Sequence, residues 1–322
     1  MKRLLFLLSL ALAPILAGAQ TYPSRPVRII VPFPPGGSVD FIARVVAQSL
    51  TEQIGNGHQF IVESRSGAGG TIGSDAVAKA APDGYMLLVE ASTLVTGPLL
   101  VKNGPYDSVK DFTAISEIGS VPLIMTVHPS VEAKNLKEFI EQQRADPKKY
   151  IFGTSPVGSA GYFATEAIKY EAKLDGMLVV PYKGTSAAIA DLLAGQVSAL
   201  IDAIPSSYPL AKSGKLRLMA VTSAERLPLM PDAPTVAESG LPGFEMESWY
   251  GLWGPAKMPR ELSTRIAAEV NKAVRSKLAN ERLTDQGFKP VGSTPEQFSA
   301  YIDKEIKRHA GIVRDAKIKV QQ

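Results

Sequence analysis

The chain has 322 residues, 45% of them hydrophobic and 20% charged, and a formal net charge of +4. This length is typical of about two domains, and the composition excludes a disordered, coiled-coil or collagen-like protein. The sequence has no cysteine, which excludes disulfides, thiolate metal sites, cysteine nucleophiles and a lipoprotein anchor. The three histidines, His58, His128 and His309, match no metal-binding spacing, and basic residues form no stripe. We therefore expect no metal, no cofactor and no nucleic acid partner.

The amino terminus has the features of a secretory signal peptide. Lys2 and Arg3 form a basic start, residues 4–16 are apolar, and a small-residue cleavage site ends at Ala19. The apolar stretch is shorter than the ~20 residues that cross a membrane, which disfavours the alternative of an uncleaved anchor. We therefore expect residues 1–19 to be cleaved near Ala19 and the mature protein to be exported, most simply to a bacterial periplasm.

Strand-like and helical segments alternate along the chain in two series. In the first series the sequence predicts strands over 27–33, 60–63 and 85–89 and helices over 38–54 and 71–80. In the second it predicts strands over 123–127, 150–153, 178–180, 199–202 and 216–221 and helices over 136–144, 162–170 and 187–193. A proline-rich, loop-like connection precedes two final helices over 260–278 and 295–315. This order predicts two parallel α/β blocks, with a carboxyl-terminal segment that returns to the first.

Three small-residue turns each join a predicted strand to a predicted helix. They span 35–38, 67–71 and 154–159. Each turn would place free backbone N–H groups and a helix N-terminus at the carboxyl end of a strand, which is an anion-binding geometry. Glycines at such junctions also serve simply to make the turn, and that alternative stays open for each turn taken alone.

Enzymatic motifs are weak or absent. The P-loop, the dinucleotide-binding glycine pattern and the G-x-S-x-G elbow are all missing, and His128 has no evident catalytic partner. Glu63, Glu90 and Asp202 lie near strand ends, where two carboxylates could pair for acid–base catalysis, although capping or hinge roles are more ordinary. The aromatic segment 249–253 is expected in the core, with the border of a cleft as the alternative.

Several blocks match, in order, the motifs of one known family. They are Tyr22-Pro-Ser-Arg-Pro-Val-Arg-Ile-Ile-Val-Pro-Phe33, Pro35-Gly-Gly-Ser-Val-Asp40, Glu63-Ser-Arg-Ser-Gly-Ala-Gly-Gly70, Ala80-Ala-Pro-Asp-Gly-Tyr85, Pro181-Tyr-Lys-Gly184, Asp191-Leu-Leu-Ala-Gly-Gln-Val197, Ala220-Val-Thr-Ser223, Asp232-Ala-Pro-Thr-Val-Ala-Glu238 and Pro290-Val-Gly292. Over about Tyr22 to Lys319 the chain resembles the substrate-binding proteins of tripartite tricarboxylate transporters, the Bug family.

The resemblance implies a two-lobed α/β periplasmic binding protein fold, type II-like, with the ligand in the interdomain cleft. The expected domains are 22–122 plus 226–322, and 123–225. By position, the implied ligand-binding residues are Phe33, Gly36, Gly37, Ser38 and Asp40 in the first turn, Ser92 and Thr93 after the third strand, Thr154, Ser155, Gly158 and Ser159 in the second lobe, and Tyr182, Thr185 and Asp202 nearby.

The resemblance further implies a non-enzymatic, monomeric protein that delivers a small carboxylate, such as a di- or tricarboxylate or an aromatic acid, to membrane permease subunits. Two alternatives use the same cleft: a ligand sensor that docks on a sensor domain, and an exported enzyme that uses the cleft acids. The chain departs from the family at Ser198, where Asp is frequent, and at Glu90, which replaces a small residue. An acid beside an anion site disfavours a second carboxylate unless it caps a helix, faces away or meets an amino group.

Overall fold

The computed structural model describes residues 22–101 and 104–320, so the predicted signal peptide lies outside the described residues. The strands are β1 (Val27–Val31), β2 (Phe60–Ser64), β3 (Met86–Ala91), β4 (Phe112–Val127), β5 (Ile151–Thr154), β6 (Leu178–Pro181), β7 (Ala199–Ala203), β8 (Arg217–Val221), β9 (Glu247–Pro255) and β10 (Lys289–Pro290). The α-helices are α1 (Ser38–Ile54), α2 (Thr71–Ala78), α3 (Thr93–Thr96), α4 (Leu136–Ala145), α5 (Ala160–Glu171), α6 (Thr185–Leu193), α7 (Ile204–Lys212), α8 (Arg260–Arg275), α9 (Lys277–Thr284) and α10 (Pro295–Asp315). None of the helices within these ranges combines the length and apolarity needed to cross a bilayer.

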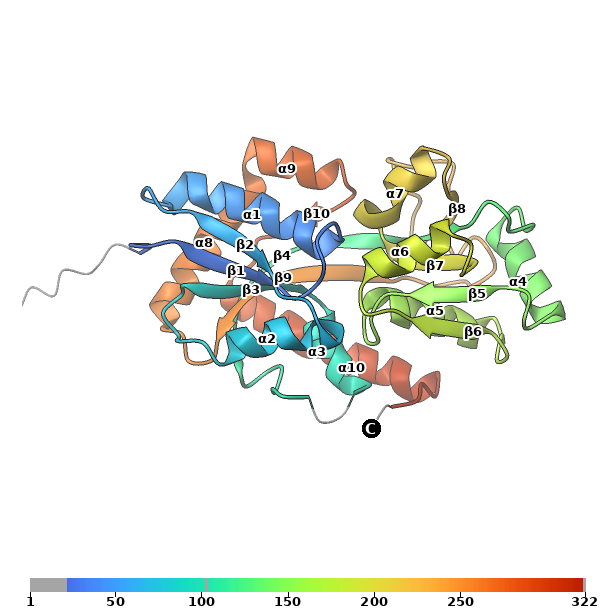
Figure 1. The fold of residues 1–322 in the computed structure, drawn as a ribbon, viewed down its shortest axis with the longest axis horizontal. Helices are drawn as coiled ribbons and strands as arrows, with labels where there is room; N and C mark the ends of the chain where they lie inside the picture. The colour runs from blue at the N-terminus through green and yellow to red at the C-terminus, as the bar shows by residue number, and fades with distance from the viewer. Residues whose placement is uncertain (1–21, 102–103, 321–322) are drawn as a thin grey trace, which may run out of the picture.

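All strands belong to one continuous, curled sheet with the order β2-β1-β3-β9-β4-β7-β5-β6, while β8 and β10 also pair with β4. The long strand β4 changes partners along its length. It pairs with β9 from Phe112 to Pro122, and with β7 from Leu123 to Val127. Strand β4 is therefore shared by two lobes, which lie side by side in Figure 1.

The first lobe contains β1, β2, β3, β9 and β10, and the second contains β5, β6, β7 and β8. Within each lobe the neighbouring pairs β1–β2, β1–β3, β5–β6 and β5–β7 are parallel, as the strand–helix alternation predicts. Helices α1 and α9 lie above the first lobe and α2 and α10 below it, while α6 and α7 lie above the second lobe. The two lobes are thus layered α/β units joined through β4 and β9.

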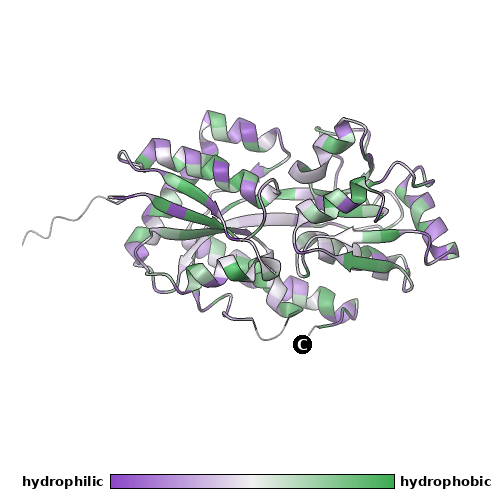
Figure 2. Ribbon diagram, in the orientation of Figure 1, coloured by the Kyte–Doolittle hydropathy of each residue, from purple (hydrophilic) through white to green (hydrophobic). Residues whose placement is uncertain are grey.

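Hydrophobic strands between amphipathic helices explain the layering. Figure 2 shows hydrophobic colouring along most strands and mixed colouring along the outer helices. In β1, four of the five side chains are buried, as expected for a strand with helices on both faces. Helix α10 begins with a capping box, in which Thr294 and Gln297 each accept the other's backbone N–H. The capped start of α10 was predicted from the sequence, and so were the bounds of both α1 and α10.

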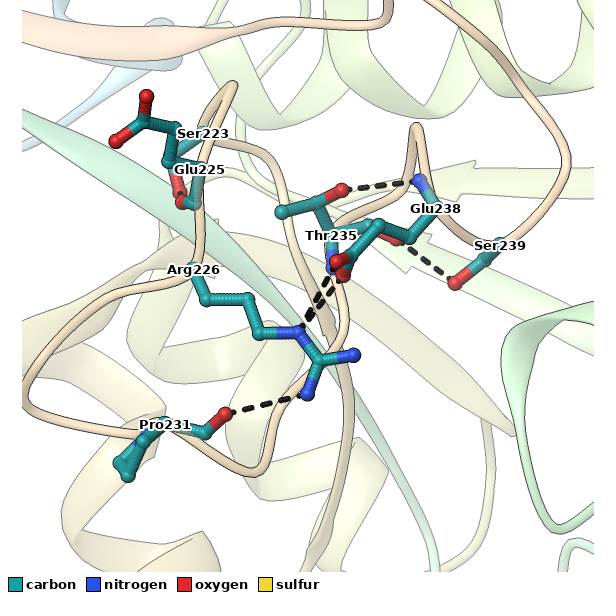
Figure 3. Close-up of polar contacts among 7 residues, drawn as sticks. All are labelled: Ser223, Glu225, Arg226, Pro231, Thr235, Glu238 and Ser239. Carbon is teal, nitrogen blue, oxygen red and sulfur yellow. Dashed lines mark hydrogen bonds and ion pairs between the residues drawn. The ribbon is translucent and has the colours of Figure 1, made fainter.

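The proline-rich segment 222–246 is ordered by its own polar contacts (Figure 3). Arg226 Nε donates to both carboxylate oxygens of Glu238, at 2.9 and 3.2 Å. Thr235 and Glu238 exchange side-chain and backbone hydrogen bonds in a second capping-box arrangement. Val221 bridges to Thr235, and the Tyr208 hydroxyl donates to Leu229 O. The segment therefore lies against the second lobe.

The structure corrects three sequence predictions of secondary structure. The strand expected over 123–127 is only the end of β4, and β9 lies where a loop-like connection was expected. Both strands are buried along almost their whole length, so they lack an alternation of buried and exposed residues, and β4 also shifts register against β9 at two bulges. The helix expected over 260–278 is two helices, because the Ser276 side chain caps α9. Helices α3 and α7 were not predicted.

Candidate functional site

A cavity of about 60 Å³ lies between the lobes. That is room for roughly four to six water molecules, and so for a small ligand. Its walls come from both lobes and from the two strands that join them. They are Phe33, Pro34, Gly37, Ser38, Val39, Asp40, Ala91, Thr93, Leu123, Ser155, Pro156, Ser159, Ala160, Gly161, Thr185, Ser186, Asp202, Ala203, Ser248 and Tyr250. We call this space the cleft cavity.

Four helices longer than two turns begin at the cleft cavity, which the four-residue helix α3 also borders with Thr93. Helix α1 brings its cap Gly37, α5 its cap Ser159, α6 its first residue Thr185, and α7 its cap Ala203. Each N-terminus carries backbone N–H groups without intrahelical partners and roughly half a positive charge. The sequence predicted two of these four, through the turns at 35–38 and 154–159. Their convergence directs the positive ends of four helix dipoles toward the cleft cavity.

No Lys, Arg or His side chain is among the described residues that line the cleft cavity. Two carboxyl groups do line it. Asp40 forms an ion pair with Arg44 (Oδ1–Nη2, 2.8 Å), and its Oδ2 accepts the Gly36 N–H at 3.2 Å. Asp202 is 2% exposed and accepts the Ser207 hydroxyl at 2.6 Å. Burial raises the pKa of Asp202 to about 7, while the hydroxyls of Ser207 and Ser206 oppose that rise.

Nine of the fourteen residues implied by the resemblance line the cleft cavity, and five do not. The nine are Phe33, Gly37, Ser38, Asp40, Thr93, Ser155, Ser159, Thr185 and Asp202. Among the five, the N–H of Gly36 is taken by Asp40, and Tyr182 donates to Asp191 at 2.6 Å. Ser92 and Thr154 are buried, each with a hydroxyl that has no hydrogen-bond partner in the described ranges. Gly158 touches the opposite lobe instead.

Strand β9 contributes cavity residues that the sequence analysis missed. Its side chains alternate between the two faces of the sheet, as in any strand. Ser248 and Tyr250 line the cleft cavity, whereas Trp249 and Trp253 pack with Phe298 of α10 in the core. The period-two pattern of the aromatic segment was the available signal. Of the two alternatives for this segment, core packing holds for the face with Trp249 and Trp253, and the cleft border holds for the face with Ser248 and Tyr250.

Direct contacts join the lobes around the cleft cavity. The Ser38 and Ser206 hydroxyls are 2.9 Å apart, and the Thr96 hydroxyl donates to Gly158 O at 2.5 Å. Gly158 has φ +84°, and a β-carbon there would overlap Gly97 Cα of the first lobe. These contacts describe a closed arrangement, in which the lobes meet across the cavity.

A second, larger pocket lies beside the cleft cavity and shares Thr93 and Pro156 with it. It includes Ala68, Gly69 and Thr71 of the second predicted turn, and Glu90. Glu90 is 1% exposed and accepts the Ser74 hydroxyl at 2.7 Å, and burial raises its pKa to about 8. The turn at 67–71 therefore does not reach the cleft cavity, and Glu90 faces away from it.

The remaining catalytic candidates do not converge. Glu63 is ion-paired with Arg28 and Arg65, while Glu90 and Asp202 line different pockets. His128 Nδ1 contacts the Ser130 hydroxyl at 2.7 Å, outside both pockets. At Ser198, the other departure from the family pattern, the side-chain hydroxyl accepts the Ile151 N–H at 3.1 Å, a structural contact within the sheet.

The family model for the tripartite tricarboxylate transporter family receptor matches residues 42–318. The chain belongs to this family. The chain is similar to Protein BugT of Bordetella pertussis, with 37% sequence identity over 94% of this chain and 93% of BugT. The resemblance inferred from the sequence motifs is thereby confirmed.

Solved structures of relatives confirm the fold of this family receptor. It matches Rpa4515 of R. palustris, solved with adipate, with 33% identity and a TM-score of 0.89 over 92% of this chain and 99% of that one. It also matches MatC from Rhodopseudomonas palustris, solved with bound malate, with 30% identity and a TM-score of 0.84 over 91% and 100%. The expected two-lobed periplasmic binding protein fold is therefore confirmed.

Proposed function

We propose that this family receptor captures a small carboxylate in the cleft cavity and delivers it to the membrane subunits of a tripartite importer. One observation carries the proposal: four helix N-termini meet in a cavity that no cationic side chain lines within the described residues. Such a cavity stabilises an anion through backbone dipoles. The adipate and malate in the structures of two relatives are both carboxylates, which supports this ligand class.

The proposed anion clamp consists of the first turns of α1 and α5, which face each other from the two lobes. The backbone N–H groups of Ser38, Val39 and Ala160 would donate hydrogen bonds to the carboxylate, since the first N–H groups of a helix have no intrahelical partners. The hydroxyls of Thr93 and Thr185 border the same space and can donate as well. Among the fourteen residues expected from the resemblance, we propose direct ligand contacts for the nine that line the cavity.

We further propose that the lobes move as two domains about β4 and β9. The exchange of β4 partners between Pro122 and Leu123 supports the first boundary expected from the sequence. The contacts of segment 222–246 with the second lobe favour a return near Glu247 over the expected return at 226. Hinge closure of this kind traps a ligand between the lobes and shifts an existing open–closed equilibrium.

We infer that the mature protein acts in the periplasm as a monomer, after cleavage near Ala19, and catalyses no reaction on its ligand. The family's periplasmic relatives support the location, and the separation of Glu63, Glu90 and Asp202 supports the absence of acid–base chemistry. Docking of the closed form on a sensor domain would use the same cavity. A pull-down in the presence of the ligand separates the two functions. We expect it to capture the permease subunits, whereas capture of a sensor protein would favour the alternative.

A thermal-shift screen of the chain from Gln20 onward tests carboxylate capture. The probes are adipate, malate, glutarate, phthalate and benzoate, each paired with its amide or methyl ester. A ligand at about 100 times its Kd adds about 2.7 kcal/mol to the free energy of unfolding. We expect at least one acid to raise the melting temperature while its amide or ester does not. Equal shifts from an acid and its ester, or turnover of the bound acid, would contradict the proposal.

A further inference from the structure

The cleft cavity contains a buried acid in an unusual position for an anion site. Asp202 is the penultimate residue of β7, is 2% exposed and lines the cavity that we propose for a carboxylate. Its Oδ1 accepts the Ser207 hydroxyl at 2.6 Å. Its Oδ2 is buried and has no hydrogen-bond partner in the part of the chain that the structure describes. A buried carboxyl oxygen without a partner is costly, so a ligand or a proton is expected at this atom.

Among the described residues that line the cavity, no Lys, Arg or His is positioned to neutralise Asp202. The elements packed against β7 are β4, β5, α5, α6 and α7, and their residues at the cavity carry no titratable groups. The other titratable residues that line the cavity are Tyr250 of β9, whose burial raises its pKa to about 12, and Asp40 of α1. The guanidinium of Arg44 forms an ion pair with Asp40, so its positive charge compensates Asp40 and not Asp202. Asp202 therefore shares the cavity with another acid and with the incoming ligand.

Two negative charges in one small cavity repel each other, and protonation of one of them removes the repulsion. Burial already holds the pKa of Asp202 near 7, and an anionic ligand in the same cavity raises that pKa further. A protonated Asp202 also supplies a hydrogen-bond donor at Oδ2, in addition to the helix N-termini and hydroxyl groups that line the cavity. A carboxylic acid that donates to a carboxylate forms a short, charge-assisted hydrogen bond.

We propose that Asp202 carries a proton in the ligand-bound protein and donates it, through Oδ2–H, in a hydrogen bond to the ligand's carboxylate. The inference rests on the proposed function, because it needs a carboxylate in the cleft cavity. No covalent bond to the ligand forms. When Asp202 is ionised in the free protein, binding takes one proton from solvent onto Oδ2, and release of the ligand returns it. Carboxylate capture is then coupled to proton uptake and weakens as the pH rises.

Calorimetric titration of the mature chain tests the coupling with adipate, malate or phthalate, whichever binds most tightly. Repeating the titration in buffers of different ionisation enthalpy measures the protons taken up. Near pH 8.5 we expect uptake approaching one proton per ligand, and an affinity that falls by about tenfold per pH unit above the pKa of Asp202. These acids are fully ionised there, so the ligand itself contributes no proton.

Asp202→Asn supplies the decisive variant, because its amide is neutral and can still donate to a carboxylate and accept from Ser207. We expect it to bind with no proton uptake and a flat affinity from about pH 6 to about pH 9. Glu90→Gln is the matched control, since Glu90 is an equally buried acid outside the cleft cavity, and it should keep the wild-type proton uptake. Circular dichroism confirms that both variants fold.

The outcomes separate the two proposals. If one of the acids binds without proton uptake, or if Asp202→Asn keeps the wild-type pH dependence, the role of Asp202 is wrong while carboxylate capture stands. If Glu90→Gln abolishes the uptake instead, the proton resides on Glu90 and this assignment is overturned. If none of the acids binds, the proposed function itself fails.

Discussion

The turns at 35–38 and 67–71 are similar in sequence and differ in what surrounds them. A β-carbon at Gly36 or Gly37 would meet no atom within 4 Å, so the first turn borders open space. A β-carbon at Gly70 would lie 3.0 Å from Phe33 Cζ, and one at Gly67 would lie 2.5 Å from Ile72 Cδ1. The first turn presents free backbone to the cleft cavity, whereas the second uses its glycines to pack closely. A glycine-rich turn at a strand end is therefore a ligand site only where the fold leaves space in front of it.

The largest expected effect is on ligand affinity in Gly37→Val. The φ of −89° at Gly37 suits any residue, and the valine side chain would enter the cleft cavity. We expect a loss of carboxylate affinity of at least about 100-fold, equivalent to about 2.7 kcal/mol, measured by calorimetry. The free energy of unfolding should change by about 1 kcal/mol or less, since only a helix cap is altered.

Two variants control that experiment. Gly311→Val places the same side chain on α10, where a β-carbon meets only Arg314 at 4.0 Å, and should bind normally. Gly70→Ala should lower stability by about 1–3 kcal/mol, because of its φ of +101° and its contact with Phe33. If Gly37→Val binds like wild type, or if Gly70→Ala is harmless, the distinction between the two turns is wrong.

Gly158→Ala tests whether the lobes must close on the ligand. A β-carbon at Gly158 would overlap Gly97 of the opposite lobe, and φ +84° adds strain. We expect affinity to fall by about tenfold, or 1.4 kcal/mol, and the ligand-induced decrease in radius of gyration to disappear in X-ray scattering. Undiminished compaction on ligand addition would show that this contact is not required for closure.

Glu90→Gln addresses the acidic pocket beside the second turn and should have the smallest effect on ligand affinity, while it changes the pH dependence of stability. The pKa of Glu90 is raised to about 8 in the folded protein, so the folded state binds this proton more tightly than the unfolded state. Its contribution to stability is complete below the ordinary pKa of glutamate and is lost as the pH rises through about 8. The melting temperature of the variant, relative to wild type, should therefore rise by at least about 2 °C between pH 5 and pH 8.5. A constant difference across this range would contradict a buried, proton-binding Glu90.

Much of the fold was predictable because it depends on local patterns. The helical periodicity of α1 and α10 and the apolar runs of β1 and β3 are encoded in neighbouring residues. Only the end of the long strand β4 was predicted from the sequence, and β9 was not predicted. They change partners and contain bulges, and both features depend on residues far away in the sequence.

The same distinction applies to the candidate site. The turns before α1 and α5 carry local glycine and serine signals, and both lie at the cleft cavity. Tyr250 and Ser248 reach the cavity only because β9 joins the lobes, and the N-termini of α6 and α7 only because of the strand order. Gly36 and Tyr182 were expected at the ligand from position in the family pattern, yet their polar groups already bond to Asp40 and Asp191. Hydrogen bonds of this kind within the protein cannot be predicted from the spacing of residues in the sequence.

A crystal structure of the mature chain with its tightest-binding carboxylate tests the anion clamp most directly. We expect the carboxylate oxygens within about 3.2 Å of backbone N–H groups in the first turns of α1 and α5, with Asp202 Oδ2 at hydrogen-bond distance. A carboxylate bound to a lysine or arginine side chain, or seated beside Glu90 in the second pocket, would contradict a site built from helix N-termini.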